Sequence, residues 1–302
     1  MPSTTIDGFS HGLVTPAAGF LVAWLGGALG LRCTNRARRS SGISRASWLA
    51  LGAGSIGVGI WTMHFVAMLG FKVVGARVSY DTGLTAGSLG VAVLVVGIGV
   101  FIVGYRGTGW AHLLPAGALM GLGIAGMHYM GMAGMHVGME LHYSVPLVVV
   151  SVVIAVVAAT VALRAAVSTS GIRASVVASL IFGVAVAAMH YTGMSALGVD
   201  SEHLSHTSGT PSTDLLVPML LGPTLFLVLA SAVVMFDPDL MLADVERDRR
   251  PSATPHRPGA SNAPATSAHP DAPYAPVASA PPVARLPVSG GHHRGDDAPG
   301  RR

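Results

Sequence analysis

The chain of 302 residues is 51% hydrophobic, only 11% charged and contains 39 glycines. This composition excludes an ordinary soluble domain, in which about a quarter of the residues are charged. It indicates an integral membrane protein with the lipid bilayer as its main partner. The net charge of +4 comes from arginines that lie between apolar stretches and form no basic stripe interleaved with aromatic residues, so we expect no nucleic-acid partner. The single cysteine, Cys33, has no second cysteine to pair with, which excludes a disulfide framework and a cysteine-based metal site.

Seven apolar stretches follow one another along the chain, each close to the roughly 20 residues that a helix needs to cross about 30 Å of hydrocarbon. Residues 1–12 carry no basic cluster, so we expect the first stretch to be a retained span and not a cleaved signal peptide. We predict spans at 12–32, 47–70, 83–105, 112–135, 145–165, 174–198 and 214–236. The short polar connections predict an all-α bundle of antiparallel neighbours, a polytopic membrane protein with seven transmembrane helices.

The arginines predict how this bundle is oriented. They follow the first, third, fifth and seventh spans, whereas the opposite connections carry only Lys72 and Arg77 as basic residues. Because lysine and arginine are retained on the cytoplasmic side, we expect the N-terminus outside and the C-terminus in the cytoplasm, in a multi-pass protein of the plasma membrane. The acidic residues and histidines of the outer connections can form either a vestibule that attracts cations or ordinary solvated loops.

A short motif recurs on the second, fourth and sixth predicted spans. It reads Trp61-Thr-Met-His-Phe-Val-Ala-Met68, Gly126-Met-His-Tyr-Met-Gly-Met132 and Ala188-Met-His-Tyr-Thr-Gly-Met194. Its histidines are separated by 64 and then 62 residues (128 − 64 and 190 − 128), which indicates a two-helix unit used three times. Since these spans all run outward, His64, His128 and His190 should reach one depth near the outer face and converge.

The motif offers ligands for a soft metal ion. Histidine and methionine four residues apart share a helix face, in the pairs His64 and Met68, His128 and Met132, and His190 and Met194. Imidazole with thioether, without thiolate or carboxylate at this depth, favours copper and in particular Cu(I), with zinc left open through histidine alone. The preceding methionines lie about 100° round the helix and either pack against a neighbouring helix or form a second layer of ligands; they are Met63, Met127 and Met189.

Each of these residues also has an ordinary structural interpretation. A lone intramembrane histidine can hydrogen-bond a neighbouring helix, and methionine commonly fills irregular cores. The threefold recurrence at a shared depth favours a metal site, because an ionisable group in hydrocarbon is costly and marks a function. Tyr129 and Tyr191 can each donate a hydrogen bond to an imidazole or to a bound diatomic molecule, or simply pack.

These Met-His-Tyr elements on alternate spans resemble the MHYT domain family of bacterial integral membrane sensors, over roughly residues 9–200. The resemblance implies an inner-membrane location, a copper site of outward-facing methionines and histidines, and sensing of oxygen, carbon monoxide or nitric oxide. It implies ligand roles for Met63, His64, Met127, His128, Met189 and His190, with Met68, Met132 and Met194 as additional ligands and Tyr129 and Tyr191 beside the bound cofactor. The first copy has Phe65 in place of tyrosine, so any role that needs a hydroxyl group is missing there.

We divide the chain into an MHYT-like domain of six spans at 9–200, an outer loop with the seventh span at 201–236, and a cytoplasmic tail at 237–302. The tail is rich in Pro, Ala and Ser, with too few large apolar residues to fold, so we predict that it is disordered. Family members are often fused to cyclic-dinucleotide synthase, phosphodiesterase or kinase modules, and nothing after Phe236 is long or apolar enough to be one. We therefore expect a standalone member that signals through a separate cytoplasmic partner or through its tail.

Four functions are compatible with the motif. A sensor would bind a diatomic gas at copper. A copper-handling or transport protein would need further ligands toward the cytoplasm, where the even spans carry chiefly Gly, Ala, Leu, Ile and Val. Two of the histidines could ligate a b-type haem, or all three could only bridge helices. The sequence has no phosphate-binding glycine loop, no H-E-x-x-H and no pair of membrane-embedded carboxylates, so we expect that the protein is not an enzyme.

Overall fold

The computed structural model describes residues 6–7, 12–73, 78–107, 109–137, 140–169, 172–200 and 210–238. Residues 201–209 of the predicted outer loop and nearly all of the predicted disordered tail lie outside these residues. Within them the chain forms seven helices, which are α1 (Val14–Ala37), α2 (Gly42–Met68), α3 (Thr82–Arg106), α4 (Trp110–Ala133), α5 (Val145–Ser168), α6 (Ile172–Ser195) and α7 (Ser212–Met235). The predicted all-α polytopic fold is confirmed, because α1 to α6 are long and apolar enough to cross a membrane and α7 contains the apolar stretch Met219–Met235.

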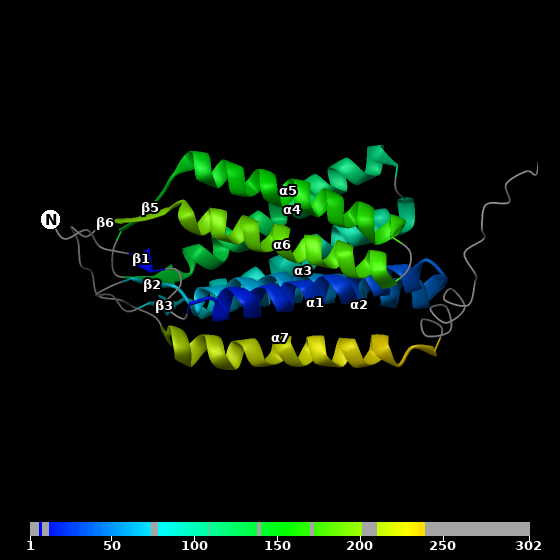
Figure 1. Ribbon diagram of the computed structural model, residues 1–302, viewed down its shortest axis with the longest axis horizontal. Coiled ribbons are helices and arrows are strands. Elements are labelled where there is room, and N and C mark those ends of the chain that lie inside the picture. The colour runs from blue at the N-terminus through cyan, green and yellow to red at the C-terminus, as the bar shows by residue number, and fades with distance from the viewer. Residues whose placement is uncertain are drawn as a thin grey trace, which may run out of the picture. The chain divides into compact units, whose positions relative to one another are not determined.

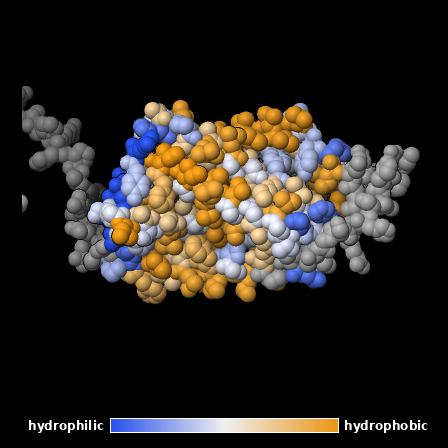
Figure 2. All heavy atoms as spheres, turned by 180° about the vertical axis from the view of Figure 1, so that it is seen from behind, coloured by the Kyte–Doolittle hydropathy of each residue, from blue (hydrophilic) through white to orange (hydrophobic). Residues whose placement is uncertain are grey.

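The helices from α1 to α6 form a closed ring. Each packs against its neighbours in sequence, and α6 returns to pack against α1. The additional helix α7 lies outside this ring against α1 and α2 (Figure 1). In consequence α2 is the most enclosed helix, with 83% of its apolar window buried, compared with 17% for α5. Hydrophobic side chains cover the middle of the molecule and hydrophilic ones gather toward its two ends, as expected for a membrane-spanning bundle (Figure 2).

The first connection differs from its prediction. Helix α1 continues to Ala37 and α2 begins at Gly42, so each helix is five residues longer at this end than predicted (37 − 32 and 47 − 42). Arginine is a good helix former, and its long side chain reaches water while the backbone stays helical. The turn itself uses Gly42, whose φ of +54° is a conformation that glycine adopts without steric cost.

The arginines of the described residues lie toward the end of the bundle where this turn is found, which we call the arginine end. The guanidinium of Arg45 donates to the carbonyl of Gly104 near the end of α3, and that of Arg38 donates to the carbonyl of Val167 near the end of α5. The last carbonyls of a helix have no partner within it, so these bonds satisfy groups that would otherwise be exposed. Arg36 pairs with Asp237 at 3.1 Å and connects α1 to the residues that follow α7.

Short antiparallel strands join the connections at the opposite end, which we call the strand end (Figure 1). Strand β1 (Ile6–Asp7) pairs with β2 (Lys72–Val73), β3 (Ser79–Tyr80) pairs with both β4 (Met135–His136) and β7 (Thr210–Pro211), and β5 (Glu140–Tyr143) pairs with β6 (Leu197–Asp200). These connections also bury apolar side chains, namely Phe71, Val73, Tyr80, Met135, Val137 and Leu197. The described residues of the outer connections therefore include paired strands and bury an apolar layer beyond the ends of α2, α4 and α6.

Candidate metal centre

Three helices that run in the same direction position the three motif histidines. His64, His128 and His190 lie four, five and five residues before the last residues of α2, α4 and α6, respectively, which corresponds to about 6–8 Å at 1.5 Å per residue. Helix α2 contacts both α4 and α6 directly, so side chains at one level of these helices can meet. The histidines lie nearer the helix ends than predicted, because α2 stops at Met68 and α6 at Ser195 and strands follow.

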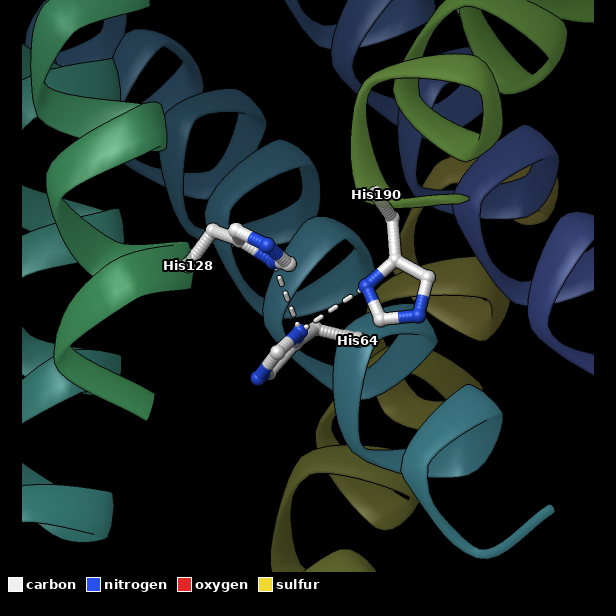
Figure 3. Close-up of side chains that lie close together, drawn as sticks. All are labelled: His64, His128 and His190. Atoms are coloured by element: carbon white, nitrogen blue, oxygen red, sulfur yellow. Dashed lines mark hydrogen bonds between the residues drawn. The ribbon is translucent and has the colours of Figure 1, made fainter. Parts of the chain in front are cut away.

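The imidazoles of these residues, which we call the histidine triad, meet through their Nδ1 atoms. The Nδ1 of His64 lies 3.0 Å from the Nδ1 of His190 and 3.1 Å from the Nδ1 of His128 (Figure 3). The rings cross at steep angles of 77° to 87°, with centroids 4.9 to 5.2 Å apart. His64 is therefore the central member of the triad, since it contacts both of the others.

The triad is enclosed by protein. No ring is more than 1% exposed. A side chain of the next residue packs edge-on against each imidazole, Phe65 at 4.6 Å and Tyr129 and Tyr191 at 4.9 Å between centroids. Without an ion, the Nδ1 of His64 cannot donate to one neighbour and accept from the other, because a ring nitrogen carries either one hydrogen or one lone pair. The site is a cluster of neutral ligand atoms in a medium of low dielectric.

These dimensions fit a metal held by three imidazoles. Metal–nitrogen bonds of about 2.0–2.1 Å place three ligands around one ion at about 3.3–3.5 Å from one another. The two direct contacts are 3.0 and 3.1 Å, and one ligand nitrogen from each ring lies within 4.8 Å of the others. To share one ion, His64 would move a few tenths of an ångström away from its two neighbours, and the nitrogens of His128 and His190 would approach each other from a separation of at most 4.8 Å.

The motif methionines surround this level of the bundle. Met63, Met68, Met127, Met132 and Met189 are at most 2% exposed, and Met194 is partly buried against the same core. Met63 packs toward α1, where a Cβ built on Gly19 would lie 3.4 Å from its Cγ. Met132 lines a pocket of about 550 Å³ beside α5, together with Tyr129 and Tyr143. Met63 thus contacts α1, and a ligand role for Met63, Met127 and Met189 stays a prediction.

The hydroxyl of Tyr129 bonds to a neighbouring helix. It lies 2.6 Å from the Oγ of Ser151 on α5, and Ser151 donates its own hydrogen to the carbonyl of Val148. Tyr129 is consequently the donor, and its hydrogen points to α5 and not to an imidazole. Tyr129 thus packs edge-on against His128 and hydrogen-bonds to α5, and its role beside a bound cofactor stays a prediction.

Other residues near the triad were not predicted from the sequence. Tyr80 on β3 is 1% exposed, packs edge-on against Phe65 at 6.1 Å, and has a hydroxyl without a hydrogen-bond partner among the described residues. Burial raises the pKa of this phenol above its ordinary value. Gly131 and Gly193 also face imidazoles of the triad. The motif contains both glycines three residues after a histidine, and that spacing was the available signal.

Comparison with known proteins places these helices among bacterial signalling proteins. The sequence model of the MHYT family, described as a bacterial signalling protein N-terminal repeat, matches residues 57–116 and 121–179. The first match contains His64 and the second His128, whereas His190 lies beyond both.

Several bacterial signalling proteins are also similar to this chain over more than half of its length. The cyclic di-GMP phosphodiesterase NbdA of Pseudomonas aeruginosa is 37% identical over 201 residues, which are 65% of this chain and 25% of NbdA. The bifunctional diguanylate cyclase/cyclic di-GMP phosphodiesterase MucR of the same species is 38% identical over 62% of this chain and 28% of MucR. The signaling protein YkoW of Bacillus subtilis is 27% identical over 58% of this chain and 23% of YkoW. The match thus spans about a quarter of each relative, and no solved structure matches this chain.

Proposed function

This chain belongs to the MHYT family and is a multi-pass bacterial membrane protein, and on that premise we propose that it is a signalling sensor that binds copper at the histidine triad. The observation that carries the proposal is the convergence of three buried Nδ1 atoms, two of them 3.0 and 3.1 Å from the third. Three imidazoles that turn a ring nitrogen toward one buried point can each give a lone pair to a single metal ion at that point.

The choice of copper rests on the chemistry of the ligands. The triad contributes imidazoles alone, and the same helix turns carry the buried thioethers of Met68 and Met132. Soft thioether and imidazole ligands favour Cu(I) over magnesium, calcium or manganese, which prefer oxygen. When bound, a Cu(I) ion held by three imidazoles would leave a coordination position open to oxygen, carbon monoxide or nitric oxide. The surrounding apolar side chains would exclude water from that position.

Signal transfer would follow from the placement of the ligands on three helices. Drawing the three Nδ1 atoms onto one ion favours a particular arrangement of α2, α4 and α6, and a second ligand at the ion would shift the population between arrangements. Helix α2 packs against α7, and Arg36 pairs with Asp237 directly after α7. This contact gives a physical route from the triad to the cytoplasmic side of the predicted orientation. We assign this chain the sensing step and no catalytic step, with a separate cytoplasmic partner as the receiver.

The alternative functions find less support in the geometry. A haem would have to insert its macrocycle between two of the imidazoles, and rings that cross edge-on at 4.9 to 5.2 Å leave no slot for it. A transport path would need a further set of ligands. Among the described residues, the triad is the one group of three or more His, Cys, Asp and Glu side chains able to share an ion.

Metal analysis of the protein purified in detergent tests the proposal. The wild-type chain should retain copper after exposure to Cu(I) and removal of the unbound ion. A variant with His64→Ala, His128→Ala and His190→Ala should retain almost none. Equal, near-zero copper in both proteins would contradict the metal proposal. A Soret band in the visible spectrum of the wild type would show that the protein binds haem and not copper.

A further inference from the structure

Two glycines of the motif face the imidazoles of the triad, on the side away from the meeting point. A Cβ built on Gly131 of α4 would lie 2.6 Å from the Nε2 of His64, and one built on Gly193 of α6 would lie 2.4 Å from the Nε2 of His128. Ordinary contacts between such atoms are about 3.5–4.0 Å. Both Nε2 atoms are buried and have no hydrogen-bond partner among the described residues. The imidazoles of His64 and His128 thus pack directly against the backbone of a glycine. The space there holds the glycine hydrogen but no larger side chain.

The contacts repeat from one helix to the next. The histidine of α2 lies against the glycine of α4, and the histidine of α4 lies against the glycine of α6. Each glycine comes three residues after the triad histidine of its own helix (131 − 128 and 193 − 190). In the first repeat the residue at this position is the buried Ala67 on α2 (67 − 64). Two of the three repeats therefore have glycine at this position, and the third has a methyl group.

We propose that Gly131 and Gly193 are positioning residues, which decide the ring nitrogen that His64 and His128 present to the metal. The backbone at each glycine packs against the Nε2 side of the ring. The Nδ1 atom of the same ring therefore faces the common centre (Figure 3). The ring cannot avoid an added methyl group by rotating freely, because Phe65 and the other two imidazoles hold His64 on its remaining sides. An alanine at either position moves an Nδ1 atom out of the triad.

A double-mutant cycle on the metal-free protein tests the contact itself. Gly131→Ala should lower the thermal unfolding temperature in detergent, and most of this loss should disappear in a His64→Ala background but persist in a His128→Ala background. Gly193→Ala should show the reverse dependence, with rescue by His128→Ala. Gly126→Ala is the matched control on α4, since a Cβ there meets no atom within 4 Å. It should not lower the unfolding temperature and can raise it slightly, because alanine favours a helix more than glycine does.

The cycle stays decisive when a single variant does not fold. If Gly131→Ala is not recovered as folded protein but the double variant with His64→Ala is, the contact is established. Equal losses in both histidine backgrounds, or failure of both double variants to fold, would overturn the inference and reduce the glycines to sites of helix packing.

The effect on metal binding rests on the proposed copper function. In a competition with a chromophoric Cu(I) chelator, Gly131→Ala and Gly193→Ala should each weaken Cu(I) binding by about 10- to 100-fold, as changes to groups that orient metal ligands do, and Gly126→Ala should not. Unchanged affinity in both glycine variants would overturn the positioning role. If the wild type itself binds no Cu(I), the copper proposal fails, whereas the metal-free cycle still decides whether the glycines position the rings.

Discussion

The Nδ1 of His64 lies 3.0 Å from the Nδ1 of His190, although 126 residues separate them in the chain. His64 makes the same kind of contact with His128 at 3.1 Å, and the two outer histidines have ring centroids 5.2 Å apart. The triad therefore has a centre, which lies on the most enclosed helix of the bundle. This unequal arrangement makes the three histidines experimentally distinguishable.

We expect His64→Ala to reduce retained copper more than His128→Ala or His190→Ala, because it removes the imidazole that contacts both others. Elemental analysis of the purified variants measures the copper-to-protein ratio. His112→Ala is the control, since this half-buried histidine lies in the first turn of α4 at the arginine end. A similar loss of copper in that variant would show that copper binds outside the triad.

Removal of the metal should destabilise the protein. A ligand that binds only the folded state adds about 2.7 kcal/mol when its free concentration is 100 times its dissociation constant. A Cu(I) chelator should therefore lower the thermal unfolding temperature of the copper-loaded wild type in detergent. The variant lacking all three histidines should unfold at the same temperature with and without chelator, and a shift in that variant would assign the stabilisation to another site.

Tyr129→Phe should cost stability without changing copper content. The hydroxyl of Tyr129 donates to Ser151, and a neutral hydrogen bond contributes about 0.5–1.5 kcal/mol. Thermal unfolding and metal analysis of the same preparation measure both effects. Loss of copper, or a changed absorption spectrum in the presence of carbon monoxide, would instead assign the hydroxyl to the metal centre.

Tyr80→Phe should be neutral or stabilising, because it removes a buried hydroxyl that has no partner among the described residues. An unsatisfied buried polar group costs about 1–3 kcal/mol. Burial also raises the pKa of Tyr80 in the folded protein, so the folded chain keeps this proton when the unfolded chain loses it near its ordinary pKa of about 10. The associated stability is complete below that pH and is lost as pH rises above it.

The pH dependence of the unfolding temperature distinguishes the contribution of the Tyr80 hydroxyl from those of other groups. Unfolding temperatures measured from neutral pH to above pH 10 should fall less steeply for Tyr80→Phe than for the wild type. Identical alkaline slopes, with a less stable variant at neutral pH, would show that the hydroxyl has a partner that stabilises the folded state.

The helices of this protein could be predicted well from its sequence, and the helix ends less well. The apolar stretches stand out because crossing hydrocarbon demands about 20 apolar residues in succession, and all seven coincide with helices. The helix ends depend on polar residues that can be helical or not, which is why α1 and α2 extend beyond their predicted limits. The strands at the other end escaped prediction because two to four residues carry too little pattern to be recognised.

The amino-acid sequence by itself determined the number of helices, their alternating direction and the common level of His64, His128 and His190. The length of an apolar stretch and the spacing of a repeated motif can both be read along the chain without knowledge of the fold. Only the tertiary structure decided that Nδ1 faces the centre, that Tyr129 donates to Ser151 and that glycines receive the other side of two rings. These features depend on how helices rotate about their axes and how closely they approach. Contacts between segments remote in the chain set both, and no local pattern encodes them.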